Sequence, residues 1–130
     1  MVREFKREWI EKSINDECIN FTEKFGEHLA NNGFTTSQIR NVFGEIKRIQ
    51  MNGFSTNKTD FLLLRPKIAY AAKRATTNSR NTGPIDFEKV IKEAHFAVNT
   101  GNPGDEKRFK NFCDFIEAVL AYHKAAGGRD

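Results

Sequence analysis

The sequence predicts an all-α protein, a single-domain bundle of five to six helices that spans residues 1–130. Apolar side chains recur three and four residues apart in nearly every segment, which is the period of an amphipathic helix. Asn, Gly and Pro separate these segments, and no stretch shows the alternation typical of a strand. Twelve phenylalanines among 130 residues predict a core built largely from Phe.

The first part of the domain, residues 3–34, is expected to form two helices. Residues 3–14 place apolar side chains on one face (Phe5, Trp9, Ile10 and Ile14). Asn15 or Asp16 is the expected cap of a second helix, which ends near Asn31 before Gly33. Its inward side chains are expected to be Ile19, Phe21, Phe25 and Leu29.

The central part, residues 35–80, is expected to hold the next two helices. Thr35 and Gln38 have the spacing of a capping box, so the third helix is expected to run from about Ser37 to Met51 and end at Asn52-Gly53. A fourth helix is expected over residues 58–77. Its apolar run 61–64 predicts burial on several sides, and Pro66 either kinks this helix or starts a new one.

The last part, residues 84–126, follows a polar loop over residues 76–84. One helix is expected over 86–99 with Asp86 as its cap, and another over 105–126 after the turn NTGNPG, ended by Gly127-Gly128. The last helix carries a single apolar stripe (Phe109, Phe112, Cys113, Ile116, Val119, Leu120 and His123).

Positive charge is concentrated in the middle of the chain. The segment from Arg40 to Arg80 contains nine basic and two acidic residues, a net charge of +7, whereas the rest of the chain carries −3. Charge polarised in this way indicates a polyanionic partner for the central helices. A solvated basic face without a ligand is the alternative that composition leaves open.

The helical period arranges these cations in two stripes. Arg40 and Lys47 lie two turns apart, about 10 Å, with Gly44 between them and Arg48 at the edge. Lys67 and Arg74 repeat that spacing on the next helix. Stripes of this kind suit phosphates along a nucleic-acid strand, without base reading. The candidate nucleic-acid-binding residues are Arg40, Lys47, Arg48, Lys67, Tyr70, Lys73, Arg74 and Arg80.

No catalytic, metal or cofactor site is expected. The histidines, at 28, 95 and 123, lack the spacing of metal ligands, and His123 is expected at a helix end, interacting with the helix dipole. Cys18 and Cys113 are far apart, which favours buried, reduced thiols. The charged N-terminus and the absence of a long apolar run predict a cytoplasmic protein without a membrane partner.

Three blocks of the sequence, in order, resemble the small subunit of the type III-A CRISPR effector, the Csm complex. They are TTSQIRNVFGEIKRIQ (35–50), LLLRPKIAYAAKR (62–74) and FKNFCDFIEAVLAYHK (109–124). The resemblance implies a small helical subunit without nuclease activity, stacked in several copies beside the backbone subunits and near the large subunit. Such copies line the channel that holds crRNA and target RNA, as single strand or heteroduplex, and contact phosphates and sugars. Tyr122 and His123 are expected to pack in the core.

Two functional hypotheses follow from the sequence. In the first, the chain is a non-catalytic RNA-binding subunit of a Csm ribonucleoprotein in antiviral defence. In the second, it is a helical interaction module whose basic face docks an acidic protein and has no direct contact with nucleic acid.

Overall fold

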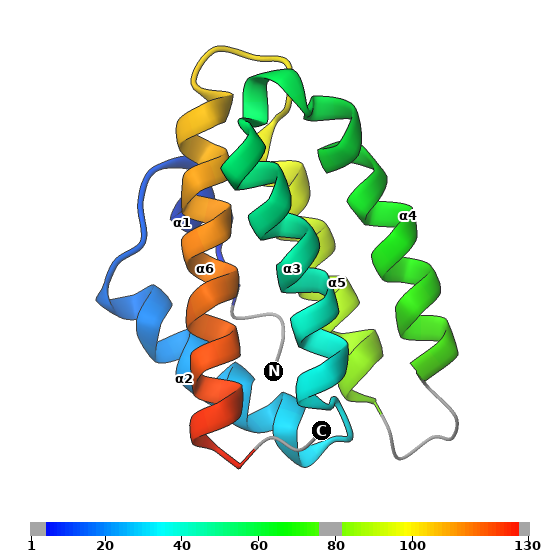
Figure 1. Cartoon of the computed structure of the whole chain (residues 1–130). Coiled ribbons are helices and arrows are strands. Elements are labelled where there is room, and N and C mark those ends of the chain that lie inside the picture. Colours follow the sequence, from blue (N-terminus) through cyan, green and yellow to red (C-terminus); the bar gives the residue numbers. More distant parts are fainter. Residues whose placement is uncertain (1–4, 76–81, 128–130) are drawn as a thin grey trace.

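The computed structural model describes residues 5–75 and 82–127, so most of the predicted polar loop lies outside the described residues. Within these ranges the chain is a bundle of α-helices with one short 3-10 helix and no strand, which confirms the all-α prediction (Figure 1). The elements are α1 (Glu8–Glu11), α2 (Asp16–Asn31), α3 (Thr36–Asn52), η2 (Phe54–Thr56), α4 (Lys58–Ala75), α5 (Gly83–Val98) and α6 (Asp105–Ala125).

The helix α6 forms the centre of the bundle and packs against α1, α2, α3 and α5. The helix α4 lies at an outer edge, where it packs against α3 and α5 (Figure 1). The chain runs along α3, turns through η2 and returns along α4, so these two helices are antiparallel neighbours. An edge helix buries one side and presents the other to solvent, which decides where the charges of α4 lie.

Two of the three helix starts predicted from side-chain caps are confirmed. The Asn15 side chain accepts a 2.9 Å hydrogen bond from the Cys18 amide at the start of α2. At the start of α3, the Gln38 amide donates to the Thr35 hydroxyl over 3.3 Å, and the Thr35 amide donates to Gln38 Oε1 over 2.9 Å. This reciprocal pair is a complete capping box, because it satisfies two amides that have no partner within the helix.

Within the described residues the first helix is shorter than predicted, since α1 covers only Glu8–Glu11 of the predicted range 3–14. Residues 3 and 4 of that range lie outside the described residues. Its end has a structural cause in α6. The Asn111 side chain donates to the Ile10 and Lys12 carbonyls over 3.0 and 3.3 Å, and so satisfies groups that a longer helix would pair internally. The chain then becomes extended at Asn15, where α2 begins.

The start of α5 also differs from the prediction. The helix begins at Gly83, and Pro84 lies in its first turn, where the missing amide hydrogen of proline costs nothing. A Cβ atom at Gly83 would lie 2.9 Å from the Asn32 carbonyl oxygen, so glycine allows the close approach that fixes this start. Asp86 is not the cap; its carboxylate pairs with His28 Nε2 at 2.7 Å.

The burial of α4 on several sides is the third incorrect prediction. Phe61 and Leu64 are buried, but Leu62 and Leu63 are 42% and 45% exposed. Pro66 lies inside one continuous helix and does not start a new one. Proline leaves the carbonyl four residues earlier without its helical donor, and that residue is the exposed Leu62, where water can take the donor's place.

The core is rich in phenylalanine, as predicted. One aromatic cluster joins α1, α2, α6 and Phe5 of the segment before α1 (Phe5, Trp9, Phe21, Phe25 and Phe115). Another joins η2, α4, α5 and α6 (Phe54, Phe61, His95, Phe109 and Phe112). Cys18 and Cys113 are free thiols buried in this core. The predicted burial of both thiols is confirmed.

Candidate nucleic-acid interface

Seven of the eight predicted RNA-binding residues lie on the two antiparallel helices α3 and α4. We use the name α3–α4 face for the exposed surface of these two helices that carries them: Arg40, Lys47, Arg48, Lys67, Tyr70, Lys73 and Arg74. All seven are exposed, because the helical period turns the apolar residues of each helix toward the bundle and these residues away from it. Arg80, the eighth, lies outside the described residues.

Two carboxylates, those of Glu45 and Asp60, form ion pairs with cations of this face. Glu45 Oε1 lies 2.7 Å from Arg48 Nη2 and 3.6 Å from Lys67 Nζ, and therefore links α3 to α4. Asp60 Oδ2 lies 3.5 Å from the same Arg48 nitrogen. We call these four residues the carboxylate cluster. The hydrogen bond from Arg48 lowers the pKa of Glu45, and the same bond raises the pKa of Arg48.

The other cations of the face lack carboxylate partners among the described residues. Arg40 and Lys73 make no ion pair within that part of the chain. Lys47 Nζ lies 5.4 Å from the centre of the Phe43 ring, and the Arg74 guanidinium lies 5.7 Å from the centre of the Tyr70 ring. Tyr70 is 66% exposed. These groups remain open to an anionic ligand and to a stacking base.

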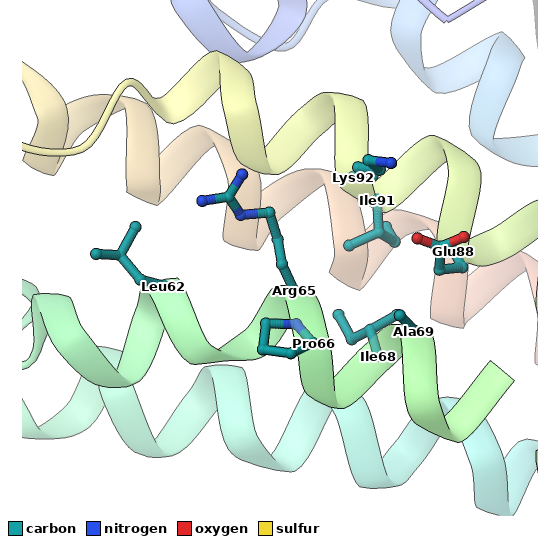
Figure 2. Close-up of a pocket in the computed structure, with 8 residues that line it drawn as sticks. All are labelled: Leu62, Arg65, Pro66, Ile68, Ala69, Glu88, Ile91 and Lys92. Atoms are coloured by element: carbon teal, nitrogen blue, oxygen red, sulfur yellow. The ribbon is translucent and has the colours of Figure 1, made fainter. Parts of the chain in front are cut away.

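The opposite flank of α4 forms an apolar groove with α5, of about 320 Å³. Figure 2 shows the residues that line it: Leu62, Arg65, Pro66, Ile68, Ala69, Glu88, Ile91 and Lys92. Arg65 extends from α4 toward α5, and its guanidinium lies 4.3 Å from the centre of the Phe96 ring. Phe96 and Leu62 are each 42% exposed. This groove suits apolar contact more than phosphate binding.

Two of the three histidines are buried in the core, where each donates a hydrogen bond to a backbone carbonyl. His95 Nε2 donates to the Phe61 carbonyl oxygen at 2.7 Å, and His123 Nε2 donates to the Phe34 carbonyl oxygen at 2.5 Å. His123 is fully buried, so it packs as expected, but its hydrogen bond crosses to another segment instead of serving the end of its own helix. In the described part of the chain, no three His, Cys, Asp or Glu side chains are grouped as a metal site would require.

Sequence reasoning missed the carboxylate cluster. The pair Glu45–Arg48 was visible, because residues three apart on a helix are neighbours. Its links to Asp60 and Lys67 cross between two helices, and no local pattern encodes them. The groove between α4 and α5 was missed for the same reason.

Comparison with known proteins identifies a family. A family model described as Csm2 Type III-A matches residues 12–129 of the chain. Neither a curated protein nor a solved structure matches it. The family match includes all of α2 to α6, and it begins well before residue 35, where the first of the three similar blocks starts. No helix within the described residues has the length and hydropathy needed to cross a bilayer.

Proposed function

This chain belongs to the Csm2 Type III-A family, the small subunit of the type III-A CRISPR Csm complex, and we propose from this membership that it is a non-catalytic subunit that binds RNA. The α3–α4 face contacts the sugar–phosphate backbone of crRNA and target RNA, independently of sequence. Cleavage chemistry belongs to other subunits of the complex. The protein works in the cytoplasm.

One observation carries this proposal: six exposed cations lie on two adjacent antiparallel helices. Phosphate binding needs guanidinium and ammonium groups on rigid elements, and it needs no base-reading motif. Arg40 and Lys47 are spaced two turns apart on α3, as are Lys67 and Arg74 on α4, about 10 Å in each case. The exposed ring of Tyr70 adds a surface on which one unpaired base can stack.

The protein partners are proposed to be the backbone and large subunits of the complex and neighbouring copies of this chain. Exposed apolar side chains at a groove are typical of protein contacts. Leu62 lines the α4–α5 groove, and the exposed Phe96 lies under the Arg65 guanidinium beside it. Both therefore support a protein contact on that flank, while the α3–α4 face is left for RNA. An edge helix with two different flanks can serve both partners at once.

The test is RNA binding by a variant that neutralises two cations, Arg40→Gln with Arg74→Gln. Fluorescence anisotropy with a labelled 40-nucleotide RNA, measured at several salt concentrations, gives affinity and salt slope together. We expect weaker binding and a log–log slope that is shallower by about 1.4. This value is about 0.7 for each phosphate of a single strand that the variant no longer neutralises.

The matched control is Lys24→Gln with Lys107→Gln. Both lysines are exposed, they lie on α2 and α6, and their neutralisation changes net charge by the same amount. An equal decrease in affinity in the two double variants would show that only net charge matters, and the α3–α4 face would be rejected as the site. Circular dichroism checks that both variants remain helical.

The second candidate function is a module that docks an acidic protein without touching RNA. The ion pairs of Arg48 and Lys67 with Glu45 and Asp60 favour it, because they show that cations of the α3–α4 face accept carboxylates. Purification of a tagged chain from cells distinguishes the two functions. An RNA-binding subunit should copurify with a processed small RNA, and the Arg40→Gln/Arg74→Gln variant should copurify with less of it. A module that docks only an acidic protein should show no such decrease in bound RNA. The assembled complex adds a second readout, because several weak contacts act together there.

A further inference from the structure

Glu45 occupies an unusual position for an acidic residue, inside the α3–α4 face. Its carboxylate accepts from Arg48 through two nitrogens, Nη2 at 2.7 Å and Nε at 3.5 Å, and also lies 3.6 Å from Lys67 Nζ. One carboxylate thus engages two of the six cations on the face. Through Lys67 it also connects α3 to α4, as Asp60 does through Arg48.

These contacts use the geometry that a phosphate would use. A guanidinium binds a carboxylate and a phosphate through the same planar pair of N–H donors. The side chains of Glu45, Arg48 and Lys67 are 33%, 43% and 56% exposed, so a phosphate can reach the cluster from solvent. A phosphate that binds Arg48 or Lys67 must therefore displace the Glu45 carboxylate or share the cation with it.

We propose that Glu45 is an internal competitor of phosphate, which lowers the affinity of the α3–α4 face for RNA. Asp60 does the same more weakly, because its carboxylate lies 3.5 Å from Arg48, farther than the 2.7 Å of Glu45. This competition rests on the proposed RNA-binding function and adds a regulation of that same site. In an assembly with many phosphate contacts, a competitor of this kind keeps each single contact weak and RNA exchange fast.

The experiment compares Glu45→Gln, Asp60→Asn and Glu23→Gln with the wild-type full chain. Glutamine can still accept a hydrogen bond from Arg48, so the substitution at 45 removes charge while keeping shape and the acceptor. Glu23 is an exposed residue of α2, away from the α3–α4 face, and its substitution changes net charge equally. The probe is a labelled 40-nucleotide RNA, titrated at several salt concentrations.

We expect Glu45→Gln to raise RNA affinity about two- to thirtyfold, the range that the removal of two exposed ion pairs implies. The salt slope should become steeper by up to about 1.4, since two more cations become available for phosphates. Asp60→Asn should give a smaller rise, and Glu23→Gln the smallest. A structural role alone would change the melting temperature of Glu45→Gln without this ordered gain in affinity and slope.

Two results would overturn the inference, and they are distinguishable. In the first, the wild type binds RNA and Glu45→Gln binds it equally well or more weakly. Competition between Glu45 and phosphate is then rejected, because Glu45 either positions the cations for RNA or has no effect on binding. The proposed RNA-binding function still stands in that case. If neither protein binds RNA, the proposed function fails and this inference fails with it.

Discussion

A buried histidine gives the protein a predictable response to acid. His95 is 2% exposed, its ring stacks on Phe61 with 3.9 Å between centroids, and Nε2 donates to the Phe61 carbonyl oxygen. Burial in the apolar core favours the neutral form of the ring, and the hydrogen bond to the Phe61 carbonyl opposes this only in part. Burial lowers the pKa of His95 to about 4 from its ordinary value of 6.5, and the nearby charge of Arg65 acts in the same direction.

The sign and size of the effect follow from this shift. Between pH 6.5 and pH 4 the unfolded chain binds a proton at residue 95 that the folded chain does not, so the free energy of unfolding falls as pH falls. At one pKa unit per 1.36 kcal/mol, the full loss of stability below pH 4 is roughly 3 kcal/mol. At pH 5.5 the loss from this group alone is about 1.4 kcal/mol.

The assay is urea unfolding at pH 7.5 and pH 5.5, followed by circular dichroism at 222 nm, for the wild type and His95→Gln. Glutamine can donate to the Phe61 carbonyl but does not titrate. The variant is expected to be less stable at both pH values, and to lose about 1.4 kcal/mol less than the wild type between them. Carboxylates titrate equally in both proteins and cancel in this difference. Equal losses of stability in the two proteins would refute the reasoning.

Two further predictions concern local structure. Thr35→Ala removes half of the capping box and should lower the free energy of unfolding by about 1 kcal/mol in a urea titration, whereas Ser37→Ala at the neighbouring exposed position should change it by less than about 0.5 kcal/mol. Burial raises the pKa of both Cys18 and Cys113 to about 12. A thiol reagent such as DTNB should therefore react slowly with the native protein at pH 8 and rapidly with the protein in denaturing urea. Fast reaction of the native protein would contradict the burial of the two thiols.

Local signals in the sequence predicted the helix starts that local contacts determine. Asn15 and Thr35 cap their helices through hydrogen bonds to residues three positions ahead, so four consecutive residues are enough to predict each cap. The start of α5 was missed because Asp86 has the same cap signal but a distant partner, His28, which only the folded chain supplies. The pair Gly83-Pro84 carried the correct signal, since proline is favoured in the first turn.

The apolar run of α4 shows the limit of composition as a guide to burial. Phe61 and Leu64 share the inward face, whereas Leu62 and Leu63 point away from it, and four apolar residues in a row do not reveal that the helix has neighbours on one side only. The features of the candidate interface also fall into two groups, those that the sequence predicts and those that depend on helix packing. The exposure of Arg40 and Lys47 follows from the helical period, but the capture of Lys67 by Glu45 depends on how two helices meet.

Two glycines inside helices give a final prediction, in which the same substitution has opposite effects. Gly44 lies on the exposed side of α3, and a Cβ atom there would meet nothing within 4 Å. Gly26 lies where α2 crosses α6, and a Cβ atom there would lie 2.7 Å from the His123 amide nitrogen and 2.8 Å from the Tyr122 carbonyl carbon. These neighbours are backbone atoms of a central helix, so relief requires moving α2 away from α6.

Gly44→Ala should therefore raise the free energy of unfolding by up to about 1 kcal/mol, because alanine loses less backbone entropy on folding and adds no clash. Gly26→Ala has the same entropic gain, but the overpacking at α6 should lower the free energy of unfolding by about 1–3 kcal/mol. Urea unfolding of both variants measures the two signs against one reference. If Gly26→Ala instead raised the free energy of unfolding, α2 and α6 would not pack this closely in solution, and the packing of these two helices described above would be wrong.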